Sequence, residues 1–297
     1  MPKNLNDGSK NPPRLKVYLN LGTLAHLPSH SKWPKLEGAE AMAFLKQEGF
    51  EGAQDGNPEH CRKAGIGSAA SARVDVVADA ESVARKFKDA GHEAVTLHVG
   101  TGFEDDAEMD KLVRAVLEAS EKIDIPLYIE THRATITQDV WRTLQLIKRI
   151  PDVRINGDFS HFYTGQELPY GDLTAKFNAM QPIFDRVRFM HGRIGSTCCM
   201  QVDIADGVTP IPQAFGIHDF LAHYREMWTR AMLGFLRSAK PGDYLVFAPE
   251  ILAPYIYYAR QFPAPDGKLQ EESDRYTQAL VYARIARECF EAARARL

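Results

Sequence analysis

Four residues whose side chains can bind a metal ion each lie at the end of a short apolar segment. They are Glu130 in "PLYIET", Asp158 in "VRINGDF", His191 in "VRFMHGRIG" and Glu250 in "YLVFAPEI". A carboxylate beside an apolar segment is costly unless a partner compensates its charge. Three carboxylates and one imidazole suit Mn²⁺ or Mg²⁺, and also Zn²⁺ or Co²⁺. Together these residues indicate a site for one divalent cation.

Each residue has a simpler explanation when it is taken alone. Glu130 could pair with a neighbouring basic side chain, and Asp158 could cap the next helix. His191 could donate to a carbonyl inside the core. Glu250 follows a proline on an otherwise apolar segment and is the hardest to explain in this way. The metal interpretation therefore depends on the whole set.

The segments that carry these residues belong to a regular alternation of β-rich and helical stretches. Alternating units of this kind imply a parallel sheet, and eight of them predict an α/β fold, a single (β/α)8 TIM barrel. The carboxyl ends of barrel strands meet at one mouth, which would bring the candidate ligands together. An open doubly wound sheet is less well supported, because the first strand–helix turns lack a G-x-G-x-x-G motif. The eight expected strands are "LKVYLNLG", "GFEGAQ", "GIGSAASA", "EAVTLHVG", "PLYIET", "VRINGDF", "VRFMHGRIG" and "YLVFAPEI".

Amphipathic helices are expected between the strands. Apolar residues recur at helical spacing over 105–123, and again over 137–150, where Thr137 is a plausible N-cap. A long helix over 275–297 ends the chain. Residues at helical spacing that we expect to pack on the barrel, rather than to bind a ligand, are Tyr224, Met227, Trp228 and Met232.

The barrel is predicted to span residues 15–297, after a flexible polar leader over 1–14. Two long stretches contain no periodic element. One is an extended loop after the seventh strand, 196–216, which contains Cys198 and Cys199, and the other is 261–274. Loops of this length in a compact domain are usually functional or disordered. No change in composition marks a second domain.

The composition argues against several classes of function. The chain has 297 residues, 44% of them hydrophobic and 25% charged, and its net charge is −3. This balance gives no electrostatic sign of nucleic-acid binding. No apolar run approaches the roughly 20 residues of a membrane helix, and the first residues lack the apolar core of a secretory signal. The four cysteines show neither zinc-ligand spacing nor a disulfide framework, so we expect a cytoplasmic protein.

Several motifs resemble the xylose-isomerase-like TIM-barrel superfamily, which includes sugar and sugar-phosphate isomerases and epimerases. They are "IETHRATITQDVWRTL", "GDFSHFY", "HGRIG" and "FAPEILAPY", and the resemblance runs from about Leu15 onwards. It implies that the metal ligands are Glu130, Asp158, His191 and Glu250. It also implies that His161, in an Asp-x-x-His motif, and Arg193, two residues after His191, contact the substrate.

The resemblance further implies an isomerase or epimerase that acts on a sugar or keto-sugar with one divalent metal ion, Mn²⁺ before Mg²⁺, Co²⁺ or Zn²⁺. Proton abstraction next to a carbonyl would give an enediolate held by the metal. Glu130 and Glu250 would remove and return the proton, each with a pKa moved towards neutrality. His161 and Arg193 would hold substrate oxygens and balance the developing charge.

Other residues near the expected mouth have less certain roles. His98, which closes the fourth strand, could bind substrate or a second metal. His132 follows Glu130 by two residues, so strand alternation places both on one side, where His132 could orient the glutamate or meet the substrate. Trp33 could stack on a sugar or simply cover the core. Tyrosines that could line the rim are Tyr255, Tyr257 and Tyr258.

Three other functions stay open. A lyase or dehydratase would use the same metal and carboxylates but expel a leaving group from a keto-sugar, a keto-glycoside or a dehydroshikimate-like substrate. A nuclease like endonuclease IV would need an Asp-x-His pair that the seventh unit lacks. A non-catalytic sugar-binding barrel would predict eroded ligands. We expect a carbohydrate substrate, no nucleic-acid or membrane partner, and a homo-oligomer, with a partner subunit as an alternative.

Overall fold

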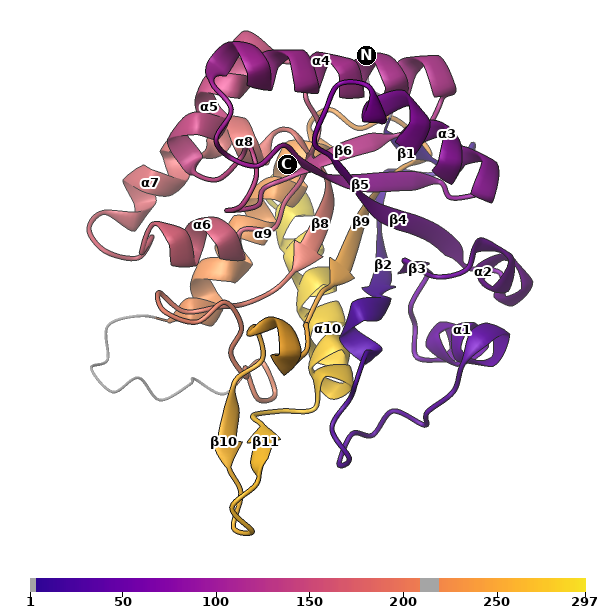
Figure 1. The fold of residues 1–297 in the computed structure, drawn as a ribbon, viewed down its shortest axis with the longest axis vertical. Coiled ribbons are helices and arrows are strands. Elements are labelled where there is room, and N and C mark those ends of the chain that lie inside the picture. The colour runs from indigo at the N-terminus through magenta and orange to yellow at the C-terminus, as the bar shows by residue number, and fades with distance from the viewer. Residues whose placement is uncertain (1–3, 209–218) are drawn as a thin grey trace.

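The structure is a computed structural model and describes residues 4–208 and 219–297 (Figure 1). Eight parallel strands form a barrel in sequence order, and the last strand closes it by pairing with the first. All eight strands predicted from the sequence are present, so the (β/α)8 fold is confirmed. Their bounds are β2 Arg14–Asn20, β3 Gly52–Gln54, β4 Gly67–Val74, β5 Ala94–Val99, β6 Leu127–Glu130, β7 Ile155–Asn156, β8 Val187–Gly192 and β9 Asp243–Pro249.

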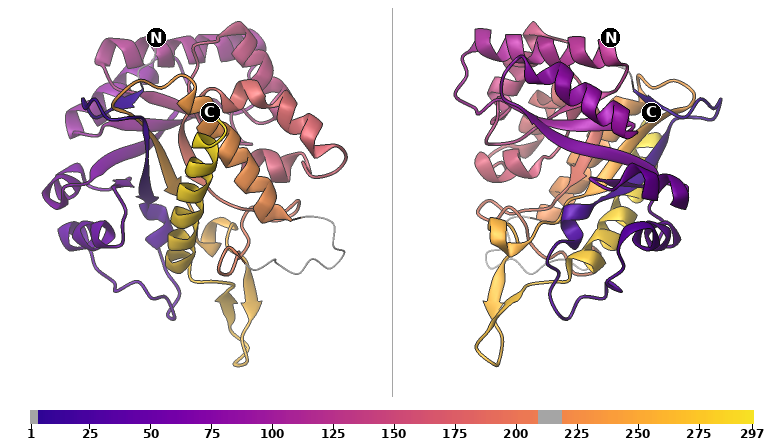
Figure 2. Two further views of the ribbon diagram at one scale, coloured as in Figure 1. Left: turned by 180° about the vertical axis from the view of Figure 1, so that it is seen from behind. Right: turned by 45° about the vertical axis from the view of Figure 1, so that its right-hand side comes forward.

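Helices form the outer layer, and Figure 2 shows the last two lying side by side behind the barrel. The described helices are α1 Gly38–Gln47, α2 Pro58–Ala64, α3 Asp79–Ala90, α4 Asp106–Ile123, α5 Val140–Arg149, α6 Ser160–Gly165, α7 Leu173–Ala179, α8 Gln181–Phe184, α9 Phe220–Leu236 and α10 Arg275–Arg294, with 3-10 turns η1 Leu21–Leu24 and η2 Pro254–Ile256. The apolar stripe expected on α9 is buried, which confirms its packing role. No helix in the described part of the chain is long and apolar enough to cross a membrane.

The predicted N-cap of α5 is wrong by two residues. Asp139, directly before the first turn, caps the helix by accepting from Arg142 N at 2.8 Å. Thr137 instead donates from Oγ1 to the carbonyl of Glu130 at 2.5 Å. Its hydroxyl therefore ties the loop after β6 back to the strand end that carries a candidate ligand.

Two stretches expected to lack regular structure contain strands. Within the leader, β1 (Leu5–Asn6) pairs antiparallel with β9, and Leu5 is buried. Within 261–274, β10 (Gln261–Pro263) and β11 (Leu269–Glu271) form an antiparallel hairpin that projects from the barrel (Figure 1). In the loop after β8, residues 196–208 contain no helix or strand, and 209–216 lie outside the described residues.

The barrel interior is apolar away from the mouth. Tyr18, Tyr128, Phe189 and Val246 are fully buried there. Gly52 faces the Tyr18 ring so closely that a Cβ would overlap it. Large side chains thus fill the barrel, and the candidate metal ligands lie at the carboxyl ends of its strands.

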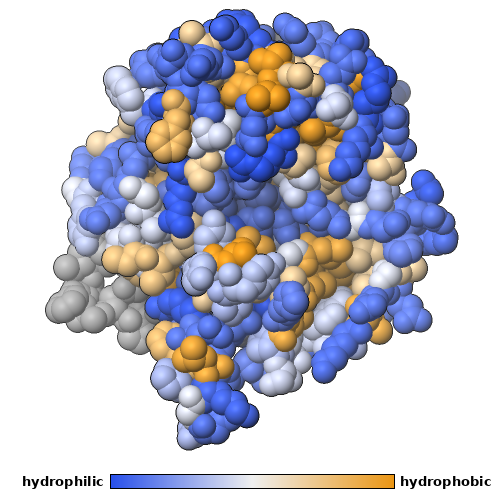
Figure 3. All heavy atoms as spheres, in the orientation of Figure 1, coloured by the Kyte–Doolittle hydropathy of each residue, from blue (hydrophilic) through white to orange (hydrophobic). Residues whose placement is uncertain are grey.

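The face of the molecule seen in Figure 3 is mainly polar. In the space-filling view, hydrophilic atoms line a central hollow, and apolar residues form separate small patches around it (Figure 3). Trp33 is buried, with its ring edge-on to Phe44 and Tyr276 at centroid distances of 5.5 and 5.2 Å. Of its two interpretations, covering the core is the one that is confirmed.

Candidate metal centre

The carboxyl ends of four strands bring the four predicted ligands together. Glu130 is the last residue of β6, Asp158 follows β7 by two residues, His191 lies in β8 and Glu250 directly follows β9. One donor atom from each lies within 4.8 Å of the others. Three of the side chains are buried, and that of Glu250 is 13% exposed. The proximity expected from strand order is therefore present.

His191 lies between the two glutamates. Its Nδ1 atom is 3.3 Å from Oε2 of Glu130 and 3.3 Å from Oε2 of Glu250. Its Nε2 atom contacts Oε1 of Gln54 at 2.8 Å. Because a carboxamide oxygen can only accept, Gln54 favours a proton on Nε2 and orients the ring so that Nδ1 can bind a metal ion once its own proton is displaced.

Asp158 has one satisfied and one unsatisfied oxygen. Its Oδ1 atom accepts from Ser160 N at 3.0 Å and from Ser160 Oγ at 2.5 Å. Its Oδ2 atom is buried and accepts no hydrogen bond, although Arg193 Nη1 forms an ion pair with it at 3.4 Å and His161 Nε2 lies 3.5 Å away. A buried carboxylate oxygen without a hydrogen bond is costly even beside a cation, and a divalent cation would satisfy it. The donor set therefore fits the expected ion.

Neutral polar residues that the sequence analysis missed connect these ligands. Asn156 Nδ2 donates to Glu130 Oε2 at 3.0 Å. Asn20 Nδ2 donates to Glu250 Oε1 at 3.0 Å and to Gln54 Oε1 at 3.1 Å. Each of these residues is the last of its strand, β7, β2 and β3. Neutral polar side chains at successive strand ends were the signal that could have found them.

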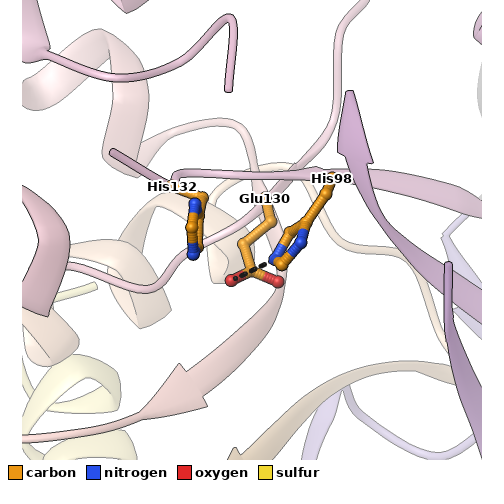
Figure 4. A group of neighbouring side chains, drawn as sticks. All are labelled: His98, Glu130 and His132. Atoms are coloured by element: carbon orange, nitrogen blue, oxygen red, sulfur yellow. Dashed lines mark ion pairs between the residues drawn. The ribbon is translucent and has the colours of Figure 1, made fainter. Parts of the chain in front are cut away.

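The predicted substrate-binding residues surround the same ligands. His98 Nε2 lies 3.2 Å from Glu130 Oε1, and the His132 ring lies between His98 and His161, with centroids 4.3 and 4.0 Å away (Figure 4 shows the first two with Glu130). His161 is buried and neither ring nitrogen has a hydrogen bond.

Arg193 places a guanidinium group in the centre. It is buried and pairs with Glu250 and, at 3.4 Å, with Asp158. The ring of Tyr258 covers its guanidinium, 4.5 Å from the ring centroid. Of the three rim tyrosines, Tyr258 is thus the one in contact with the site, whereas Tyr255 and Tyr257 are exposed.

Comparisons with known proteins define the fold. No family model and no curated protein matches the sequence. A D-tagatose 3-epimerase-like protein matches with a TM-score of 0.51 and 11% identity over 95% of this chain and 99% of its own. The probable 3-DHS dehydratase AsbF of Bacillus anthracis matches with 0.51 and 15% over 81% and 94%. A xylose isomerase-like TIM barrel protein of Mycobacterium smegmatis, in complex with magnesium, matches with 0.50 and 14% over 95% and 97%.

The chain has a (β/α)8 TIM-barrel fold that is similar to the folds of these proteins. The resemblance found in its sequence motifs is confirmed at this level. At such low identities the likeness concerns the fold and leaves the reaction to be argued from the site.

Within this xylose-isomerase-like barrel, both glutamates are ionised at neutral pH. Burial raises the pKa of Glu130, but His191 and His98 outweigh it and hold that pKa well below its usual value. Burial likewise raises the pKa of Glu250, and His191 and Arg193 lower it overall. The expectation that both glutamate pKa values move towards neutrality is therefore wrong in direction, because cationic neighbours outweigh burial.

The histidines and Asp158 respond differently. Burial lowers the pKa of His191, but the facing Glu250 and Glu130 raise it well above its usual value. Burial, with His98 nearby, lowers the pKa of His132 to about 4. Burial raises the pKa of Asp158 to about 6, although Arg193 opposes this. Asp158 is thus the carboxyl of the centre whose charge is least well compensated.

Proposed function

We propose that this protein is a divalent-metal-dependent isomerase or epimerase that acts on a sugar or keto-sugar. The observation that carries the proposal is the cluster of four donor residues, three of them buried, in which one oxygen of Asp158 has no hydrogen bond. Glu130, Asp158, His191 and Glu250 would hold the ion. When bound, such an ion supplies Lewis-acid polarisation of a carbonyl oxygen. Three carboxylates and one imidazole favour Mn²⁺, with Mg²⁺, Co²⁺ and Zn²⁺ as alternatives.

Glu130 and Glu250 are the proposed acid–base pair. Their lowered pKa values keep both ionised, which is the form that can accept a proton. β6 and β9, the strands that present them, are separated by β7 and β8 on the barrel wall. From these positions, one ionised glutamate would remove a proton from a carbon next to a carbonyl. The other glutamate, once it has taken up a proton from water, would deliver that proton to the opposite face of the carbon.

Arg193, His161 and His98 would bind the substrate. Arg193 places a buried positive charge beside two of the ligands, which would stabilise negative charge that develops on a substrate oxygen. His161 has two buried ring nitrogens without hydrogen bonds, and a sugar hydroxyl could satisfy one of them. A small carbohydrate is therefore the proposed substrate class, and a homo-oligomer in the cytoplasm stays an expectation.

A lyase is the second candidate. It shares the first step, because a base beside a polarised carbonyl can remove the same proton. It differs in the second step, in which the electron pair expels a group from the β-carbon. The likeness in fold to the probable dehydratase keeps this reaction open without favouring it.

Proton NMR in D₂O tests both reactions. Manganese-loaded protein is incubated with a set of keto-sugars and keto-glycosides, and the recovered compounds are analysed after the metal is removed. Deuterium next to the carbonyl without loss of a group supports an isomerase or epimerase, whereas loss of a group supports a lyase. Glu130→Gln and Glu250→Gln should each abolish turnover. Full activity in both variants would contradict the acid–base assignment, and no exchange with any compound would contradict both reactions.

A further inference from the structure

A second group of possible ligands lies beside the centre. His98, Glu130 and His132 each present a donor atom within 4.8 Å of the other two (Figure 4). Glu130 faces His191 with Oε2 and His98 with Oε1, so that its carboxylate could bridge two cations. From composition alone, this group predicts a two-metal site. The hydrogen bonding of His132 argues against a second metal ion at this group.

The backbone fixes the tautomer of His132. The amide N–H of Ala134 donates to Nδ1 of His132 at 3.1 Å. An atom that accepts this hydrogen bond cannot carry a proton, so the proton of the neutral ring lies on Nε2. A metal ligand needs a free lone pair, and Nε2–H does not offer one. Binding through Nδ1 would require loss of the Ala134 contact.

The Nε2–H group is directed into the site. In Figure 4, the ring nitrogen of His132 that is farther from its backbone lies on the side of the Glu130 carboxylate. The ring is held between His98 and His161, at centroid distances of 4.3 and 4.0 Å. Among the described residues, no acceptor lies within hydrogen-bond distance of Nε2. A neutral N–H donor next to the proposed base is thus available to an oxygen atom that enters the site.

We propose that His132 is a fixed hydrogen-bond donor to a substrate oxygen and that the centre binds one cation rather than two. The proposal rests on the proposed function for the identity of the oxygen, which would be one that gains negative charge when Glu130 removes a proton. A preset neutral N–H donor stabilises such charge without having to reorient. The composition of the His98–Glu130–His132 group therefore resembles a metal site, whereas its hydrogen bonding is that of an oxyanion donor.

The tautomer can be observed directly. Long-range ¹H–¹⁵N NMR of the ¹⁵N-labelled protein, loaded with diamagnetic Mg²⁺, separates the Nδ1–H and Nε2–H forms, and His132→Gln assigns the signal. We expect the Nε2–H form before and after metal loading. The Nδ1–H form, or a change of tautomer when a second equivalent of Mg²⁺ or Zn²⁺ is added, would overturn the proposal.

Two variants test the donor role. His132→Gln keeps an N–H group at the end of the side chain, and His132→Phe keeps a flat ring without one. The probe is acetohydroxamate, a planar chelator with the shape of an enediolate, measured by calorimetry on the magnesium-loaded proteins. Loss of one such donor should weaken binding about 10- to 100-fold in His132→Phe, while His132→Gln binds like the wild type.

Metal content separates the donor role from a ligand role. Native mass spectrometry should find one Mg²⁺ per chain in the wild type and in both variants. Two ions in the wild type that fall to one in His132→Phe, or unchanged probe binding by that variant, would overturn the proposal. If no protein binds the probe, the proposed function is contradicted, but the tautomer and the metal count still decide the role of His132.

Discussion

Asp158→Asn is predicted to stabilise the metal-free protein while it removes tight metal binding. Asp158 is fully buried, and its Oδ2 atom accepts no hydrogen bond. Burial raises its pKa from 3.8 to about 6. At pH 8, an ionised carboxylate with such a pKa destabilises the folded state by about 3 kcal/mol relative to one with an unshifted pKa.

Part of this free energy is not recovered in the variant. Asparagine keeps an oxygen for the two hydrogen bonds from Ser160, at 3.0 and 2.5 Å. Its amide nitrogen, however, takes the place of Oδ2, which lies 3.4 Å from Arg193 Nη1. Two hydrogen-bond donors then face each other. We expect a net gain in the free energy of unfolding of about 1–3 kcal/mol at pH 8.

The pH dependence has a definite sign. A raised carboxyl pKa penalises the ionised form, so the penalty is absent at low pH and grows as the pH rises from 3.8 through about 6. The variant and the wild type should therefore differ little at pH 4. Urea unfolding of EDTA-treated proteins between pH 4 and 8 measures this difference, with Asp266→Asn, an exposed position in the β10–β11 hairpin, as the control.

Metal binding completes this test. Calorimetry with Mn²⁺ should show affinity at least about 100-fold lower for Asp158→Asn, since loss of a ligand costs no less than loss of a supporting residue. If the variant is less stable than the wild type at pH 8, or binds Mn²⁺ equally well, Asp158 is an ordinary structural carboxylate and the reasoning is refuted.

Three further predictions concern groups around and away from the centre. Gln54→Leu should lower Mn²⁺ affinity about 10- to 100-fold by calorimetry, because Gln54 orients His191; unchanged affinity would rule this out. Metal binding should release a proton, because an ion must displace the proton that Glu130 and Glu250 stabilise on His191, and metal affinity should therefore decrease as the pH is lowered. Equal binding enthalpies in buffers of different ionisation enthalpy would show that no proton is released. Asp274→Ala should lower the free energy of unfolding by about 1–2 kcal/mol without affecting metal binding, because Asp274 caps α10. Hydrogen bonds outweigh burial and lower the pKa of Asp274, so the difference in unfolding free energy between variant and wild type, measured with urea, should shrink as the pH falls below 3.8.

The strands and the cluster of candidate ligands were predictable because each leaves a local signal. An apolar run that ends in a carboxylate is unusual, and three such ends with a fourth that carries a histidine, on alternating βα units, indicate a barrel mouth. The capping of α5 was harder to predict, since Thr137 and Asp139 are both good caps and the choice depends on where the first turn begins. The β1 strand pairs with β9, which lies far away in the sequence, so no local pattern reveals it.

The hydrogen-bonding network of the site was less predictable for a related reason. Asn20, Gln54 and Asn156 are common residues at strand ends, where they can equally begin a turn. Their importance becomes clear only in the structure, where they lie within 3.0 Å of Glu250, His191 and Glu130. The predicted shift of the two glutamate pKa values was likewise wrong in direction, because the sequence indicates burial but not which cations face each carboxylate.

Isotope exchange as a function of bound metal tests the central claim most directly. Protein stripped with a chelator is reloaded in steps with Mn²⁺, and the rate at which deuterium enters a keto-sugar next to its carbonyl is measured by NMR at each step. The proposed function predicts no exchange in the stripped protein and a rate that rises in proportion to bound metal until one ion is present per chain. Exchange at full rate in the stripped protein would contradict it.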